Sequence, residues 1–364
     1  MTKRKEYKLG DVLAVRYGKD HKSLGNGQYP VYGSGGIMRY ADRYLYDKES
    51  ILIPRKGSLN NIFYQEGPFW TVDTMFWTEI DKAKVEPKFL FYQLTLVDLE
   101  NLNVGSAVPS LTVPVINDID ITLPPLDEQK RIAGVLSSLD DKIDLLHREN
   151  ATLEALAETL FRHYFIENPD PTWKEGNIAD VVDFNPARKL GKGEKAPYVE
   201  MANIGTIGYA PSSWRIRSFV SGTKFINGDT LMARISPCLE NGKAAFVDFL
   251  EKEQVGWGST EFIVMRSKLG IHLFFAYVLS RYDDFRDHAV SSLVGSSGRQ
   301  RVDLDNLIKY PFIIPDKQAI ELFNHELNTI FPKMQNNQKQ ILTLTAQRDT
   351  LLSRLMNGEV NVVE

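Results

Sequence analysis

The sequence contains one unit that occurs twice, and this duplication limits the possible folds more than any other feature. Four segments of the first half have a counterpart in the second half, in the same order. The matched segments are 51–55 with 230–234, 70–77 with 257–265, 104–106 with 294–296, and 118–124 with 309–315. We therefore expect two copies of a unit of about 190 residues, since repeats of this kind determine the whole architecture.

The second part of each copy carries a heptad pattern. Residues 127–165 contain no proline and one glycine, and their apolar residues alternate at spacings of three and four. This pattern predicts a coiled-coil helix, with an amphipathic helix packed on a globular domain as the alternative. The predicted seam consists of Ile132, Leu136, Leu139, Ile143, Leu146, Asn150, Leu153 and Leu160, and in the second copy Phe323, Leu327, Ile330, Met334, Ile341, Leu344, Leu351 and Leu355.

Three residues qualify this prediction. Asn150 occupies a seam position, where a polar side chain fixes the register of the helices at some cost in stability. Pro332 lies inside the second helix, about 316–357, and predicts a kink or a break near 328–332. Gly358 follows Asn357 and predicts the end of that helix.

The first part of each copy is rich in glycine, aromatic and β-branched residues, which predicts short strands with some helix, including 87–99 and 270–287. The predicted fold class is α+β, with two tandem mixed α/β domains separated by long helices and related by an internal repeat. The predicted segments are 1–123 (first domain), 124–170 (central helix), 171–314 (second domain) and 315–364 (C-terminal helix).

The formal charge of −4, from 43 basic and 47 acidic residues, argues at first against nucleic-acid binding. Its distribution changes that inference. Residues 124–170 hold 10 acidic and 5 basic side chains, whereas residues 1–60 hold 12 basic and 6 acidic ones. The acidic excess therefore belongs mainly to the central helix.

Several classes of protein are disfavoured. A single cysteine, Cys238, provides no disulfide framework and no cysteine-based zinc site. No apolar signal segment follows the basic start, and the apolar run 271–279 is about half the length of a bilayer span, so we expect a cytoplasmic protein without membrane contact. The phosphate loop, the dinucleotide fingerprint and the HExxH motif are absent, and no catalytic or metal-binding residue is predicted.

Five segments resemble the specificity subunit of type I restriction–modification systems. The run 123–133 (LPPLDEQKRIA) resembles that family's entry into its central helix, although the second copy has IPDKQ at 314–318 instead. The other four segments resemble parts of the family's target-recognition domains. They are 51–58 (ILIPRKGS), 228–243 (GDTLMARISPCLENGK), 258–262 (GSTEF) and 295–302 (GSSGRQRV).

The resemblance implies a subunit that performs no chemistry. Each target-recognition domain would read one half of a bipartite site in double-stranded DNA, and the two helices would pack antiparallel as a spacer with pseudo-two-fold symmetry. Two modification subunits would bring S-adenosylmethionine and methylate adenine, and restriction subunits would add ATP- and Mg²⁺-dependent cleavage. The chain itself would bind no cofactor. The alternatives are a subunit of another multisubunit methyltransferase or restriction system, a fused enzyme, and a coiled-coil adaptor that does not contact DNA.

DNA contacts require basic and polar side chains on loops. For each candidate the alternative is a solvated charge or a local ion pair. The predicted DNA-binding residues are Lys19, Lys22, Ser34, Arg39, Arg43, Arg55, Lys56, Asn60 and Asn61 in the first domain, and Lys189, Lys192, Arg215, Arg217, Arg234, Asn241, Lys243, Arg299 and Arg301 in the second. Trp70, Trp77 and Trp257 are assigned to the core rather than to base stacking.

Overall fold

A computed structural model describes residues 4–268, 270–296, 298–360 and 362 of the chain. The chain forms two compact units: unit 1 combines Met1–Lys142 with Leu344–Glu364, and unit 2 is Ile143–Thr343. Each unit therefore contains one α/β part together with a stretch of both long helices. Ser297, which belongs to one of the segments that resemble the family, lies outside the described residues.

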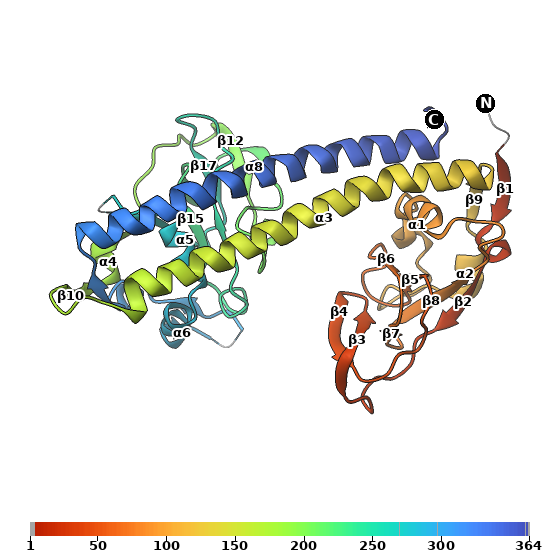
Figure 1. Cartoon of the computed structure of the whole chain (residues 1–364), viewed down its shortest axis with the longest axis horizontal. Coiled ribbons are helices and arrows are strands. Elements are labelled where there is room, and N and C mark those ends of the chain that lie inside the picture. The colour runs from red at the N-terminus through yellow and green to blue at the C-terminus, as the bar shows by residue number, and fades with distance from the viewer. Residues whose placement is uncertain (1–3, 269, 297, 361, 363–364) are drawn as a thin grey trace. The chain divides into compact units, whose positions relative to one another are not determined.

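Unit 1 is built on a four-stranded antiparallel sheet with strand order β2-β8-β5-β6. A second sheet has the order β4-β3-β7, in which β3 and β7 run parallel, and β1 pairs with β9. Figure 1 labels these elements. Their bounds are β1 (Lys5–Lys8), η1 (Leu9–Asp11), β2 (Leu13–Tyr17), β3 (Asn26–Gly33), β4 (Gly36–Ala41), β5 (Ser50–Pro54), β6 (Phe63–Gln65), β7 (Trp70–Thr71), β8 (Met75–Ile80), α1 (Pro87–Thr95), η2 (Leu99–Leu102), α2 (Val113–Asn117) and β9 (Asp120–Leu123).

Unit 2 has the same plan. Its antiparallel sheet has the order β11-β18-β15-β16, its second sheet the order β13-β12-β17-β14, and β10 pairs with β21. The bounds are η3 (His163–Glu167), β10 (Lys174–Asn177), α4 (Ile178–Val181), β11 (Val182–Phe184), β12 (Lys195–Val199), η4 (Met201–Asn203), β13 (Arg215–Ser218), β14 (Thr223–Phe225), β15 (Thr230–Ala233), β16 (Ala244–Phe246), β17 (Gly256–Gly258), β18 (Phe262–Ser267), α5 (Phe275–Arg281), α6 (Asp283–Ser291), β19 (Leu293–Val294), β20 (Arg301–Val302), α7 (Leu304–Leu307) and β21 (Pro311–Ile314).

The two units share even the unusual parallel pairing. In unit 1, β3 pairs in parallel with β7 through Val31 and Trp70, and in unit 2, β12 pairs in parallel with β17 through Tyr198 and Trp257. These are the two tryptophans that the sequence comparison aligns. The predicted α+β class and the internal repeat are therefore confirmed.

The two long helices are α3 (Leu126–Arg162) and α8 (Lys317–Met356). Within each unit their segments lie side by side and run in opposite directions (Figure 1). In unit 2, Asn150 contacts Asn337 at 3.0 Å, and the ring of Tyr164 lies 6.4 Å from that of Phe323. In unit 1, Asp140 accepts a hydrogen bond from Arg348 at 2.8 Å.

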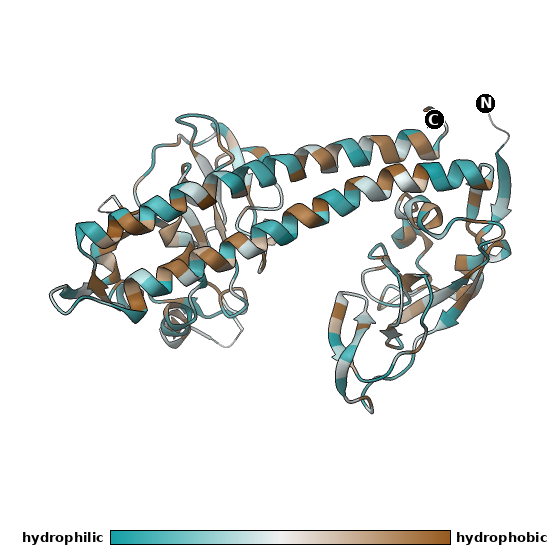
Figure 2. Cartoon of the chain, in the orientation of Figure 1, coloured by the Kyte–Doolittle hydropathy of each residue, from teal (hydrophilic) through white to brown (hydrophobic). Residues whose placement is uncertain are grey.

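The helices take part in the core of each unit. In unit 1, Ile132 and Leu355 are buried in one cluster with Phe89 of α1, and in unit 2, Phe161 and Phe323 are buried with Phe275 of α5. Figure 2 shows apolar positions recurring along both helices. None of the predicted seam residues is exposed. Burial of this stripe anchors each α/β part to the helices, because removing apolar surface from water stabilises the contact.

Two details of the predicted helices are wrong. Helix α8 does not break near Pro332, because it continues through this residue to Met356, and the kink near 328–332 stays a prediction. Pro332 itself is exposed, whereas its neighbours Phe331 and Met334 are buried, and this packing keeps the helix intact despite the missing backbone donor. The predicted helix 270–287 is instead two helices, α5 and α6, separated at Tyr282, whose backbone is extended.

The end of α8 follows the prediction. Gly358 has a φ of +73°, its N–H donates to Leu355 at 3.2 Å, and the N–H of Glu359 donates to Arg354 at 2.9 Å. These two bonds form a Schellman motif, which satisfies carbonyls that a helix end leaves without partners. The Arg4 guanidinium adds hydrogen bonds to the carbonyls of Met356 and, at 2.8 Å, Leu355. No helix in the described part of the chain is long and apolar enough to span a membrane.

Candidate nucleic-acid interface

One group of loops in unit 1 gathers several of the predicted DNA-binding residues. We call it loop cluster 1, and it comprises residues 55–61, which follow β5, residues 104–111, and Thr74, which precedes β8. The N–H of Arg55 donates to the carbonyl of Thr74 at 2.8 Å, and the N–H of Leu111 donates to the carbonyl of Arg55 at 2.9 Å. Lys56 and Ser110 form a β-bridge. These backbone bonds therefore fix the position of Arg55 directly after the end of β5.

The corresponding loops of unit 2 have the same bonds. Loop cluster 2 comprises residues 234–243, which follow β15, residues 299–302, and Glu261, which precedes β18. The N–H of Arg234 donates to the carbonyl of Glu261 at 2.9 Å, and the N–H of Val302 donates to the carbonyl of Arg234 at 2.9 Å. Ile235 and Arg301 form the bridge. Arg55 and Arg234 are therefore equivalent residues of the repeat.

These two arginines also share an incomplete set of partners. Both side chains are half-buried, and the Nε atom of each is buried without a hydrogen-bond partner among the described residues. A buried donor of this kind costs free energy unless it finds an acceptor. The Arg55 guanidinium lies 5.8 Å from the ring of Tyr17, which is 55% exposed. The part of each half-buried side chain that remains accessible can still donate to a phosphate.

All the predicted DNA-binding residues are at least partly accessible. Those that are exposed are Lys19, Lys22, Arg43, Lys56, Asn60, Lys189, Lys192, Arg215, Arg217, Asn241, Arg299 and Arg301. Those that are half-buried are Ser34, Arg39, Arg55, Asn61, Arg234 and Lys243.

Some of these side chains have structural partners. Arg39 donates to the carbonyls of Leu24 at 2.6 Å and Gly25 at 2.9 Å, so it holds the loop that carries Lys22. Asn61 donates to the carbonyl of Ser34 at 2.7 Å, which joins the β3–β4 turn to loop cluster 1.

In unit 2, three further candidates are already engaged. Lys243 donates to the carbonyl of Met201 at 3.2 Å, Arg215 pairs with Glu200, and Arg217 lies 4.6 Å from the ring of Tyr198. These interactions fit supporting roles. Arg55, Lys56, Arg234 and Arg301 are the basic candidates that lie in the backbone pairings of the two clusters, and of these Arg301 pairs with Glu261.

The tryptophans have the positions expected of core residues. Trp77 and Trp257 are buried, and their indole N–H groups donate to the carbonyls of Tyr17 at 3.1 Å and Arg217 at 3.4 Å. Trp70 is half-buried and donates to the carbonyl of Lys19 at 2.9 Å. These bonds fix the indoles beneath the surface that carries the basic residues.

Sequence reasoning missed Glu261 and Tyr17. Arg301 donates to both carboxylate oxygens of Glu261, at 2.6 to 3.1 Å. This hydrogen bonding, together with the nearby charge of Arg234, holds the pKa of Glu261 below its usual value. An acidic residue is not sought in a DNA interface, although Glu261 lies in one of the segments that carry the family resemblance. In the structure, its backbone carbonyl accepts from the N–H of Arg234, as the carbonyl of Thr74 accepts from the N–H of Arg55 in the other unit.

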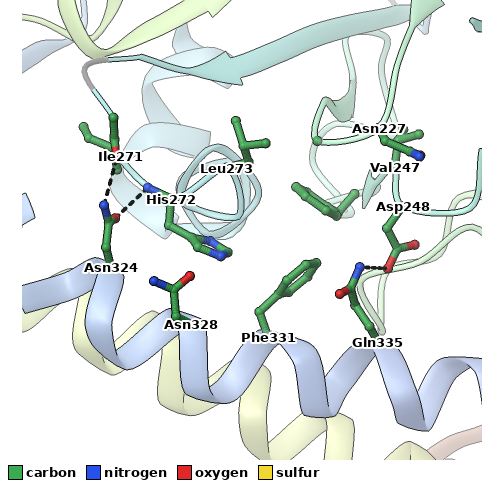
Figure 3. Close-up of a pocket in the computed structure, with 13 residues that line it drawn as sticks. Asn227, Val247, Asp248, Ile271, His272, Leu273, Asn324, Asn328, Phe331 and Gln335 are labelled. Atoms are coloured by element: carbon green, nitrogen blue, oxygen red, sulfur yellow. Dashed lines mark hydrogen bonds between the residues drawn. The ribbon is translucent and has the colours of Figure 1, made fainter. Parts of the chain in front are cut away.

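Unit 2 also contains a cavity of about 450 Å³ that lies outside the loop clusters (Figure 3). Helix α8 contributes Asn324, Asn328, Phe331 and Gln335, and the opposite wall includes His272 and Asp248 (Figure 3).

Burial lowers the pKa of His272 to about 4 and raises that of Asp248. None of the described residues that line the cavity is a lysine or an arginine, and a phosphate would require such a positive charge. Among the described residues, no three His, Cys, Asp or Glu side chains are grouped as metal ligands would be.

Comparison with known proteins finds similarity to type I restriction–modification specificity subunits. The family model for the type I restriction modification DNA specificity domain matches residues 1–155. The chain is 26% identical to the specificity subunit of the type I restriction enzyme MjaIX from Methanocaldococcus jannaschii, over all of this chain and 90% of that protein. It is 20% identical to the HindI specificity subunit from Haemophilus influenzae, over 76% of this chain and 78% of that one.

A solved structure has a similar fold. The crystal structure of the S subunit of a type I restriction–modification system from M. genitalium has a TM-score of 0.60 to this chain, with 18% identity, over 97% of this chain and 96% of that one.

Proposed function

We propose that the chain is a specificity subunit of a type I restriction–modification system, which reads DNA sequence for a methyltransferase and restriction complex and performs no chemistry itself. The match of residues 1–155 to the family model and the 26% identity to the MjaIX specificity subunit support this proposal. Each unit reads one half of a bipartite site in double-stranded DNA. The modification subunits bring S-adenosylmethionine and methylate an adenine in each half, and restriction subunits supply the ATP- and Mg²⁺-dependent cleavage.

One observation supports this proposal most strongly. Both units present a half-buried arginine donor at the same backbone position after a central strand of the sheet, next to further basic residues of the same loop cluster. A duplicated protein that reads two DNA segments needs such a donor twice, once in each reader. An adaptor that contacts only protein has no need for two equivalent basic loop clusters.

The long helices have a separate role in this proposal. Their antiparallel seam sets the distance between the two readers and so the length of the unread gap, in the way that dimer geometry sets half-site spacing. The acidic outer face of α3 is the docking surface for the modification subunits. The acidic excess of residues 124–170 is unfavourable next to phosphates and therefore fits a protein partner.

The test is an exchange of one reader. The chain is co-expressed with its modification subunits, and methylated sites are mapped on DNA from cells that lack the system. Replacing residues 14–110 with the corresponding segment of another specificity subunit is expected to change one half of the bipartite motif and to leave the other half and the gap unaltered. If both halves changed, or neither did, the two-reader model would be wrong.

Two further measurements separate the alternatives. The purified chain alone, with S-adenosylmethionine, Mg²⁺ and mixed DNA, is expected to show no turnover, and measurable methylation or cleavage would favour a fused enzyme. The assembled complex is expected to bind DNA with an affinity that falls steeply as salt rises, because phosphate contacts release counterions. If the complex did not bind DNA, the adaptor alternative would replace this proposal.

A further inference from the structure

The two loop clusters have the same backbone and different side chains. The residue whose carbonyl accepts from the cluster arginine is Thr74 in unit 1 and Glu261 in unit 2. The residue in the β-bridge is Ser110 in unit 1 and Arg301 in unit 2. Features that both readers need are expected to be identical, and features that distinguish the two half-sites are expected to differ. By this comparison, Arg55 and Arg234 are features that both readers share, whereas Glu261 and Arg301 occur in unit 2 alone among the described residues of the two clusters.

The guanidinium of Arg301 is held from one side. Its Nε donates to Glu261 Oε2 at 2.8 Å and to Oε1 at 3.1 Å, and its Nη2 donates to Oε1 at 2.6 Å. The Arg301 side chain is 47% exposed and that of Glu261 is 21% exposed, so the pair lies at the surface with the carboxylate on its inner side. The carboxylate therefore fixes the plane of the guanidinium.

This arrangement leaves the outer edge of Arg301 available. A guanidinium has five N–H donors in a planar fork. The carboxylate uses Nε and one hydrogen of Nη2, and Nη1 has no partner among the described residues. The remaining hydrogens of Nη1 and Nη2 form a pair of parallel donors. In the major groove, O6 and N7 of guanine are the pair of acceptors that matches such a fork.

We propose that Arg301 reads a guanine in the half-site bound by unit 2, and that Glu261 is the positioning residue that orients it. The inference rests on the proposed function and deepens it by assigning one base to one side chain. Unit 1 has Ser110 and Thr74 at the equivalent places and therefore lacks this contact. Arg55 and Arg234, which both units share, contact the DNA backbone.

Glu261 is suited to orienting rather than to reading. Both of its oxygens are occupied by Arg301, and Arg234 lies close enough to stabilise its charge. An arginine held in advance loses less conformational freedom on binding than a mobile one, because its rotamers are already restricted. Removing Glu261 is therefore expected to weaken the preference for guanine without replacing it by another base.

The experiment uses the full chain assembled with its modification subunits. Methylated sites are mapped on a plasmid library in which each position of both half-sites is randomised, and the base preference is measured at each position. Arg301→Ala is expected to reduce the preference for guanine at one position of one half-site by about ten-fold or more, because a bidentate contact is lost. The other half-site is expected to be unchanged.

Three variants sharpen the assignment. Arg301→Lys is expected not to restore the preference, because an ammonium cannot donate in a planar fork. Glu261→Ala is expected to lower it by a smaller factor than Arg301→Ala. Arg162→Ala is the matched control, because Arg162 pairs with Glu167 at 3.9 Å at the exposed end of α3 in the same unit. This control is expected to alter no base preference.

If a variant complex no longer methylates DNA, its base preference is measured by DNA binding instead. Duplexes are prepared with 7-deazaguanine in place of each guanine of the site in turn, which removes N7 without changing pairing. The wild-type complex is expected to lose affinity at one guanine of the unit 2 half-site, and the Arg301→Ala complex is expected not to distinguish the two bases there.

The inference is overturned if every position keeps its preference in Arg301→Ala, if the base that changes is not guanine, or if the wild-type complex is insensitive to each substitution. A wild-type complex that methylates no bipartite site would instead refute the proposed function.

Discussion

Asn337 donates a hydrogen bond from Nδ2 to Oδ1 of Asn150 at 3.0 Å, and both side chains are buried in the seam. Asn150 donates in turn to the carbonyl of Met334 at 3.3 Å. The repeat aligns Asn337 with Leu146 and Asn150 with Ile341, which are buried and apolar. The two copies of the seam therefore differ at these positions, since each asparagine aligns with an apolar residue of the other copy. The single polar pair favours the observed register of the two helices over shifted ones.

The polar pair gives a prediction about stability. Asn337→Leu leaves Asn150 with a buried amide oxygen that has lost its donor, so we expect a loss of about 1–3 kcal/mol of unfolding free energy. The double variant Asn150→Leu, Asn337→Leu removes both amides of the pair and also the hydrogen bond from Asn337 to Glu149 at 2.9 Å, while Glu149 keeps its ion pair with Lys333. It is therefore expected to be more stable than Asn337→Leu. Urea denaturation followed by circular dichroism measures both. A double variant less stable than either single one would contradict this account.

The end of α8 gives a second prediction. Arg4→Ala removes the hydrogen bonds to Met356 and Leu355, and we expect the last turn of α8 to exchange its amide hydrogens faster, with a loss of about 1 kcal/mol. Hydrogen exchange followed by mass spectrometry over 350–358 is the measurement. Lys5→Ala, at the adjacent residue in β1, is the control, and equal exchange in the two variants would argue against the cap.

The spacer role predicts a change of gap length. Inserting seven residues after Lys142 in α3 and seven after Thr343 in α8 preserves the heptad phase of both helices. Seven helical residues span about 10 Å, which corresponds to about three base pairs, so the methylated motif is expected to have a gap about three base pairs longer. Insertion in α3 alone is expected to abolish activity, since it mismatches the seam. An unchanged gap would show that the helices do not set the spacing.

The equivalent arginines predict matched losses. Arg55→Ala and Arg234→Ala are each expected to weaken DNA binding of the assembled complex at all sequences and to reduce the slope of log affinity against log salt by about one. Base preference is expected to stay the same in both variants. Salt titration of binding by fluorescence anisotropy is the measurement. A change of base preference with an unaltered slope would assign these arginines to reading rather than to backbone contact.

His272 predicts a dependence of stability on pH. Its pKa is about 4 in the folded chain because of burial, against 6.5 when exposed, so the unfolded chain binds the proton more readily between these values. Stability is therefore expected to fall as pH drops from 6.5 towards 4. We expect about 1–2 kcal/mol in total, because the side chain keeps some contact with water.

Comparison with His272→Gln isolates this effect. Asp248 lines the same cavity, and its raised pKa acts in the opposite direction in both proteins. The difference in unfolding free energy between the two proteins is expected to be constant above pH 7 and to change as pH falls below 6.5, because the substitution also removes the hydrogen bond from the Phe274 N–H to His272 at every pH. A difference that did not vary with pH would contradict the assignment.

The seam could be predicted from the sequence because heptad spacing is a local pattern that burial preserves. The intact helix at Pro332 could not, because the packing of Phe331 and Met334 that outweighs the lost bond involves distant residues. The separation of α5 from α6 at Tyr282 has no glycine or proline to mark it. The sheet orders are likewise set by pairings between distant segments.

The candidate interface was predictable in part. Arg55 and Arg234 were identified by residue type and by the repeat. Glu261 was missed, because its role depends on a neighbour that is 40 residues away in the sequence.

The division into units also determines the order in which the protein can be completed. Unit 2 comes from the single stretch Ile143–Thr343, whereas the core of unit 1 requires Leu352, Leu355 and Met356 beside residues of the first 142. During synthesis, the first reader is therefore made long before the three side chains that complete its core. Until α8 has been synthesised and has docked, that reader leaves apolar surface exposed, which favours aggregation or the binding of a chaperone.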